Sequence, residues 1–443
     1  MASRYPCREG FDRPALGAPL RFDFSGRVAK NRLMKAATTE KMASWSPTDK
    51  SARGIPGDEL MTLYRTWALG GFGIVVTGNI LIDHNHIEGK GNMIVPIDAP
   101  LSGPLFDGFQ KLAAAGKSGG TLFLGQLNHP GRQCLQSIQP DPVSASDVQL
   151  TMRMFGDGFA KPHPASLDEI RAITAAFVHA AVFLDRAGFD GIQLHGAHGY
   201  LLAQFLAETT NLRTDAYGGS LPNRARLVTE IADGIRAQTR SDFVLSIKIN
   251  SVEFEAKGLP TEEAAQLCEL LEAHGFDFVE LSGGTYQELA LCHRRETTRA
   301  REAFFLEFAD KIVPRLTRTR TIVTGGLRSA GAMVDALRTV DGVGLARPAC
   351  SEPYLARDLL AGKVDACLKP LLDDNDFGIT ASLAAAQIGL IGQGLEAFDP
   401  SDLEAAGALN EGFASWKKTL FSKDGGDLLH HLKTRLAQVP PGA

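Results

Sequence analysis

The stretch Gly188-Phe189-Asp190-Gly191-Ile192-Gln193-Leu194-His195 combines a helix stop with a buried strand. Gly188 can end a helix in the left-handed conformation, and the apolar residues after it suit a parallel strand covered on both faces. The same unit recurs at residues 71–78 and 275–282. Repetition of helix, glycine and strand is typical of a closed α/β barrel or a doubly wound sheet.

The segments between these units have helical spacing. Residues 166–169, Ser-Leu-Asp-Glu, form a capping box, and apolar residues then recur at helical intervals as far as Leu184. A second helix begins with Pro-Thr-Glu-Glu at residues 260–263, where the helix dipole favours the two glutamates.

Eight alternating pairs of strand and helix favour a closed (β/α)₈ barrel, the TIM barrel, over an open sheet. We expect strands near residues 33–38, 73–79, 121–127, 191–195, 243–249, 277–282, 320–324 and 342–346. We expect helices near residues 58–70, 103–116, 166–187, 222–238, 261–274, 301–315, 329–339 and 351–361. The long segments that follow strands lie at the C-terminal face, where barrel active sites are found; they are residues 80–102, 128–165, 204–221 and 283–300.

The chain is expected to divide into a barrel, residues 1–364, and a C-terminal extension, residues 365–443. The extension falls outside the eight pairs of a barrel. Its apolar stretch Ala381–Ile391 predicts a helix packed on the outside of the barrel.

Composition indicates a soluble enzyme. Hydrophobic residues make up 44%, charged residues 22%, and the net charge of −5 indicates no surface for nucleic acid. The six cysteines are scattered without a Cys-x-x-Cys pair, which argues against a structural zinc or an iron–sulfur cluster. No signal peptide and no apolar run of membrane-spanning length is evident, so we expect a cytoplasmic protein without a membrane partner.

Two histidines and a tyrosine follow the strand at 191–195. His195 and His198 are three residues apart, and Tyr200 lies two further on. Two imidazole N–H groups that converge on one oxygen would polarise a carbonyl, and a neutral tyrosine hydroxyl could deliver a proton. A histidine cluster that caps the core, or a metal site, fits the same spacing.

The segment that contains His195, His198 and Tyr200 resembles the Old Yellow Enzyme family of flavin oxidoreductases. So does the run at residues 211–220, Asn-Leu-Arg-Thr-Asp-Ala-Tyr-Gly-Gly-Ser. Lys-Asn-Arg at 30–32 and Gln-Leu-Asn-His-Pro-Gly-Arg at 126–132 match it too. The resemblance covers about residues 17–362 and is strongest to fungal members. It implies an ene-reductase that uses FMN, takes NAD(P)H as reductant, and reduces small alkenes activated by a carbonyl or nitro group. A homodimer would fit, and no metal is expected.

The resemblance also implies roles for individual residues. His195 and His198 match the pair that holds the activating oxygen of the substrate, and Tyr200 matches the group that protonates Cα after hydride passes from flavin N5 to Cβ. Gln126 matches a residue that binds the flavin pyrimidine, and Lys248 takes the place of a cation near flavin N1, where it would stabilise the anionic reduced ring.

The remaining FMN contacts fall at strand ends. Barrels commonly bind phosphate after strands seven and eight, which points to two pairs of residues, Gly325-Gly326 and Ala346-Arg347. Strand one and strand two contribute the expected contacts Ala37, Thr38, Thr39 and Asn79. Thr39 stands where many bacterial relatives carry a cysteine, and Asn79 stands where a small residue is common.

Two other functions fit the same sequence. A metal-dependent barrel hydrolase or lyase would use His195 and His198 as ligands. A flavin-binding protein without catalytic activity would share the cofactor contacts.

Overall fold

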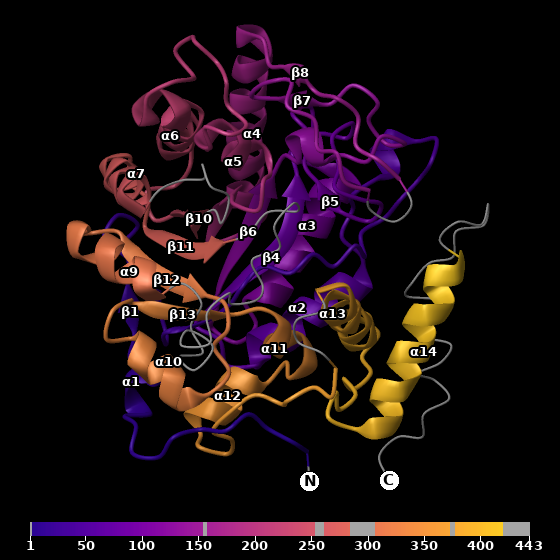
Figure 1. Cartoon of the computed structure of the whole chain (residues 1–443), viewed down its shortest axis with the longest axis vertical. Helices are drawn as coiled ribbons and strands as arrows, with labels where there is room; N and C mark the ends of the chain where they lie inside the picture. The colour runs from indigo at the N-terminus through magenta and orange to yellow at the C-terminus, as the bar shows by residue number, and fades with distance from the viewer. Residues whose placement is uncertain (1, 154–156, 253–260, 284–305, 373–376, 420–443) are drawn as a thin grey trace.

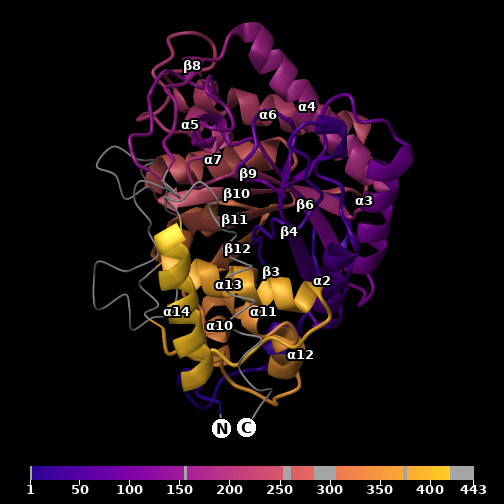
Figure 2. The ribbon, with the colours of Figure 1, turned by 90° about the vertical axis from the view of Figure 1, so that its right-hand side faces the viewer.

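The computed structural model is a closed barrel of parallel strands inside a ring of helices (Figures 1 and 2). It describes residues 2–153, 157–252, 261–283, 306–372 and 377–419. The barrel strands are β3 (Leu33–Lys35), β4 (Ile74–Leu81), β6 (Leu122–Asn128), β9 (Gly191–Gly196), β10 (Val244–Val252), β11 (Phe278–Gly283), β12 (Arg320–Thr324) and β13 (Gly342–Leu345). Each pairs in parallel with its neighbours, and pairing of β3 with β4 closes the ring. The predicted barrel is confirmed.

Helices follow the strands as expected. They are α2 (Asp58–Leu69), α3 (Gly103–Gly116), α4 (Leu167–Ala187), α6 (Leu221–Gln238), α7 (Thr261–Ala273), α9 (Leu306–Ile312), α10 (Ala330–Ala336) and α12 (Leu355–Leu360). Residues 301–305 of the predicted sixth helix lie outside the described residues. The capping box that starts α4 is present, and Gly188 ends this helix with φ 95°.

Shorter helices and strands lie outside the eight strand–helix pairs. They are α1 (Pro14–Gly17), β1 (Leu20–Arg21), β2 (Val28–Ala29), η1 (Lys50–Ala52), β5 (Met93–Ile94), η2 (Gly131–Gln133), β7 (Val143–Ser144), β8 (His163–Pro164), α5 (Leu201–Leu206), η3 (Val313–Arg315) and α11 (Arg347–Ser351). The segment between β1 and β2 fills the N-terminal end of the barrel, because Phe22 stacks on Phe278 with ring centroids 5.3 Å apart. Apolar side chains therefore close that end, and the functional groups gather at the other.

Aspartates that precede barrel strands, two of them in the repeated unit, join neighbouring strands. Asp190, Asp277 and Asp341 each precede a strand and accept the backbone N–H at the start of the barrel strand before it, at 3.0, 3.0 and 2.9 Å. Asp277 is fully buried and also pairs with Arg236 at 2.8 Å. The repeat thus specifies a hydrogen bond between strands as well as the strand itself.

The C-terminal region is helical. The predicted apolar stretch lies within α13 (Phe377–Gly392), which packs against α2 and α11 on the outside of the barrel (Figure 1). The following helix, α14 (Leu403–Thr419), contacts α13. Among the described residues, no helix has both the length and the apolar character to cross a membrane.

Asp277→Ala should lower the free energy of unfolding by about 3–5 kcal/mol, the usual cost of removing one member of a buried ion pair. The change leaves Arg236 without its carboxylate and two backbone N–H groups, of Ser25 and Leu245, without their acceptor. Denaturation of the flavin-loaded protein in urea measures the effect. The matched control is Asp233→Ala, whose side chain is 61% exposed and pairs with His274; equal losses in both variants would contradict the role of Asp277.

Candidate active site

His195, His198 and Tyr200 meet at the C-terminal end of β9. His195 lies in the strand, and His198 adopts φ 59° in the turn that leads to Tyr200, the residue before α5. The ring centroids of His195 and His198 are 5.1 Å apart, and the Tyr200 ring lies 4.6 Å from that of His195. The left-handed turn therefore gathers the three side chains that the spacing singled out.

Both histidines are uncharged at neutral pH. Burial, followed by the neighbouring imidazole of His198 and the charge of Lys248, holds the pKa of His195 well below its ordinary value. Burial and the charge of Lys248 lower the pKa of His198 to about 3. In the structure, His195 Nε2 and His198 Nδ1 are 2.9 Å apart and share a hydrogen bond. Their role at this site therefore depends on which nitrogen of each ring carries the hydrogen.

A buried polar network crosses four strands beside this pair. Lys248 on β10 pairs with Glu280 on β11 at 3.0 Å, and Glu280 accepts from Gln193 on β9 at 2.8 Å. Gln193 in turn accepts from Gln126 on β6 at 2.8 Å. Lys248 and Gln126 thus lie in one network, and the two residues that connect them, Gln193 and Glu280, were not predicted. Glu280 could have been found, since a charged residue in an apolar strand needs a partner just as Lys248 does.

The two threonines after β3, Thr38 and Thr39, each make a hydrogen bond to a charged side chain. Thr38 accepts a hydrogen bond from the buried amine of Lys35 at 2.7 Å, and burial lowers the pKa of Lys35 to about 8. Thr39 donates to Glu88 at 3.3 Å. Ala37 precedes them and packs against the apolar interior of the barrel. This segment joins the barrel wall to the loop that carries Glu88.

Asn79 is the second residue near the histidines that departs from the family pattern. Its amide oxygen lies 2.8 Å from His195 Nδ1, and its amide nitrogen donates to Glu88 at 2.7 Å. Glu88 lies between β4 and β5 and also pairs with Lys41 at 3.3 Å. Sequence analysis placed this loop at the C-terminal face but did not single out Glu88.

The residues predicted to bind phosphate follow two neighbouring strands, β12 and β13. Gly325 and Gly326, with φ 140° and 76°, follow β12, while Ala346 and Arg347 follow its neighbour β13. The hydroxyl of Thr324, at the end of β12, is buried without a hydrogen-bond partner in the described part of the chain. An oxyanion held there would accept a hydrogen bond from it.

Arg347 also binds the C-terminal region. Its guanidinium donates to the Thr380 hydroxyl of α13 at 2.8 Å. A hollow beside it is lined by residues of the barrel end and of α13, among them Arg328, Glu352 and Leu383. Arg347 therefore connects the end of the barrel to the C-terminal region.

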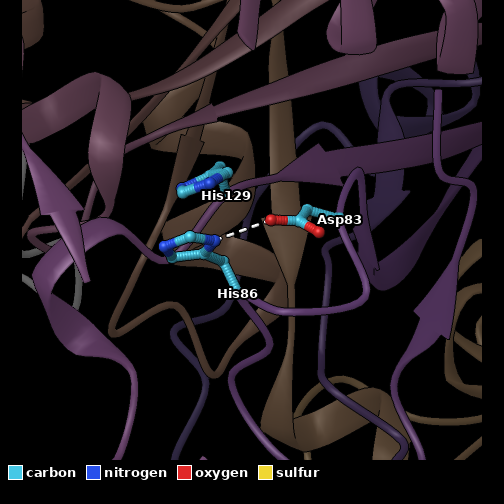
Figure 3. Close-up of side chains that lie close together, drawn as sticks. All are labelled: Asp83, His86 and His129. Atoms are coloured by element: carbon cyan, nitrogen blue, oxygen red, sulfur yellow. Dashed lines mark hydrogen bonds and ion pairs between the residues drawn. The ribbon is translucent and has the colours of Figure 1, made fainter. Parts of the chain in front are cut away.

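Figure 3 shows a second cluster, in which the rings of His86 and His129 lie close together beside Asp83. His86 Nε2 accepts the N–H of Val143 at 3.4 Å, so its Nδ1–H donates to Asp83 at 2.6 Å. His129 Nδ1 likewise accepts the N–H of Gly131 at 3.1 Å. A metal-bound histidine instead donates from its other ring nitrogen. We interpret the cluster as a link between the segments after β4 and β6.

The sequence profile of the NADH:flavin oxidoreductase / NADH oxidase family matches residues 18–365. The chain belongs to this family. The NADH-dependent flavin oxidoreductase nadA of Aspergillus parasiticus is 48% identical over 93% of both chains. The NADH-dependent flavin oxidoreductase iccE of Talaromyces variabilis is 35% identical over 76% of this chain and 84% of its own.

Solved structures agree on the fold. Morphinone reductase in complex with tetrahydroNAD superposes with a TM-score of 0.64 at 23% identity, over 81% of this chain and 93% of that one. The Old Yellow Enzyme homologue from Zymomonas mobilis gives a TM-score of 0.64 at 21% identity, over 80% and 94%. These structures confirm the predicted barrel fold, and the family profile and the 48% identical relative confirm the predicted flavin oxidoreductase.

FMN is the expected cofactor of this family, with NAD(P)H as reductant. The residues present fit FMN. The pair of glycines and the buried Thr324 hydroxyl suit its single phosphate, and the network of Lys248 and Gln126 suits the polar edge of its ring.

Two substitutions in the Lys248–Glu280 pair should move the flavin midpoint potential in opposite directions. Lys248→Met removes the cation that would balance the charge of reduced flavin, so the potential should fall. Glu280→Gln removes the anion that offsets Lys248 at 3.0 Å, so the potential should rise. Redox titration of both variants, after FMN retention is verified, measures the shifts. Shifts of the same sign would contradict an electrostatic role for the pair.

Proposed function

We infer that this flavin oxidoreductase is an ene-reductase, which reduces the C=C bond of an α,β-unsaturated carbonyl compound or a nitroalkene. The observation that carries the proposal is the buried, uncharged pair His195–His198 with the Tyr200 ring beside it. A small activated alkene is the substrate class that this arrangement suits. Steady consumption of NAD(P)H with cyclohexenone tests the activity, and its absence would favour a flavin-binding protein without catalysis.

The chain's own residues bind and polarise the alkene. FMN, when bound, supplies the hydride transfer from NAD(P)H to the β-carbon. The activating oxygen binds between His195 and His198, and hydrogen bonding there stabilises the charge that develops on it. Tyr200 then gives its hydroxyl proton to Cα, since a phenol with an ordinary pKa near 10 carries that proton at neutral pH.

The contacts near FMN are assigned with the same proposal. Gln126 and Lys248 bind the pyrimidine edge of the flavin, and the phosphate lies among the backbone groups that follow β12 and β13. Thr38, Thr39 and Asn79 line the wall between them. Residues 1–364 form the FMN-binding barrel, and residues 365–443 are an extension that packs on it through α13.

Tyr200→Phe should slow only one half of the catalytic cycle. The substitution keeps the ring that packs against His195 and removes the hydroxyl proton. Flavin reduction by NAD(P)H needs no proton from this group, so its rate should change little. Reoxidation by cyclohexenone should slow by about 100- to 10,000-fold, the usual size of a lost general acid. Rapid mixing measures the two half-reactions separately.

Tyr217→Phe is the matched control, because its hydroxyl donates to Glu230 on α6. Both half-reactions should be unchanged in this variant. Equal slowing of both halves in Tyr200→Phe would mean a disturbed pocket, and an unchanged rate with cyclohexenone would mean that another group supplies the proton.

A further inference from the structure

We propose that Glu88 is a positioning residue: through the amide of Asn79 it holds His195 with its hydrogen on Nδ1, so that His198 alone donates to an oxygen in the pocket. Its consequence for which substrate groups bind rests on the proposed function. Its structural core, the tautomer of His195, is independent of any activity.

The carboxylate of Glu88 determines how the Asn79 side chain is oriented. Glu88 can only accept hydrogen bonds when ionised, and its Oε2 lies 2.7 Å from the Asn79 side chain. The atom of Asn79 that faces it must therefore be the NH₂ group, because an amide oxygen there would oppose a carboxylate oxygen. Thr39 donates to the same oxygen at 3.3 Å, and the Glu88 side chain is only 10% exposed, so water competes little for this carboxylate.

The orientation of Asn79 in turn determines the tautomer of His195. With its nitrogen on Glu88, Asn79 presents its oxygen to His195 Nδ1 at 2.8 Å, so this nitrogen must carry the hydrogen. His195 is uncharged, so its Nε2 then has a lone pair. The 2.9 Å contact with His198 Nδ1 is consequently donated by His198, whose own Nε2 lies 3.3 Å from the hydroxyl of Ser282. Every hydrogen bond along this row points toward Glu88.

This arrangement has a consequence for the substrate. The sequence predicts two N–H donors at this pair. In the row of hydrogen bonds, however, His198 Nδ1 donates and His195 Nε2, which faces it, accepts. A ketone oxygen, which only accepts, is received by His198 alone. A group with its own hydroxyl, such as an enol, a phenol or a carboxylic acid, satisfies both rings, since it can donate to His195 Nε2 and accept from His198. Such groups are favoured over anionic oxygens that need two donors.

The tautomer can be observed directly. Nitrogen-15 NMR of the FMN-loaded, histidine-labelled protein distinguishes a ring nitrogen that carries hydrogen from one that does not, and His195→Gln assigns the resonances. In the wild type, His195 should show hydrogen on Nδ1. Hydrogen on Nε2 of His195 in the wild type would overturn the proposal.

Glu88→Gln tests the cause. Glutamine can face Asn79 with either an oxygen or an NH₂ group, so the amide is free to turn and His195 should gain a measurable Nε2–H population. The matched control is Lys41→Gln, which removes the ammonium group that pairs with Glu88 at 3.3 Å. This variant should leave the tautomer of His195 unchanged. An unchanged tautomer in Glu88→Gln, or an equal change in the control, would overturn the proposal.

Phenol binding gives the second measurement. With 4-chlorophenol, the wild type should bind the neutral phenol and show a weak long-wavelength band. Glu88→Gln should bind the phenolate about tenfold or more tightly, the size of one added hydrogen bond to a charged group, and the band should strengthen. Equal phenolate affinity in the two proteins would contradict the inference. If the wild type carries hydrogen on His195 Nδ1 but does not reduce cyclohexenone, the proposed function is refuted and the inference about the tautomer stands.

Discussion

Closure of the barrel is the constraint on which the rest of the structure depends. β3 is only three residues long, yet its pairing with β4 and β13 joins the first strand to the second and the last. Once the ring is closed, the inward side chains at the C-terminal strand ends are cut off from solvent on every side but one. A buried polar group without a partner costs about 1–3 kcal/mol, so these groups must bind one another or a ligand. The Lys248–Glu280–Gln193–Gln126 network follows from this requirement.

The fold could be predicted because its determinants are local. A glycine that ends a helix and the apolar run after it occupy a few consecutive residues, as at Gly188, and the repeated unit therefore located the strands. The site was predicted only where its residues share one segment or match a family motif, as His195, His198 and Tyr200 do. Glu280 and Glu88 were missed because their partners lie on other strands. Glu88 comes from a loop, and nothing in a loop sequence says which strand end its side chain reaches.

The phosphate side of the site shows the same limit. Gly325 and Gly326 could be placed from the barrel's strand order alone. Arg347 is predicted to contact the same phosphate, but its guanidinium also donates to Thr380 on α13. The C-terminal region thereby contributes to a wall of the barrel end. The covalent order of the chain, which puts this region outside the eight pairs, does not reveal that contact.

The histidine pair lies between two charges of opposite sign. Burial lowers the pKa of both rings, and the charge of Lys248 lowers it further, so both rings stay uncharged. Glu88 lies at the other end of the row, beyond Asn79. If His195 were charged, both its nitrogens would donate and the carboxylate could not select between them. Because burial and the cation suppress that charge, a carboxylate that touches neither ring can determine which nitrogen carries the hydrogen. The two charges thus have separate effects: Lys248 reinforces the effect of burial on the protonation state, and Glu88 sets the direction of the hydrogen bonds.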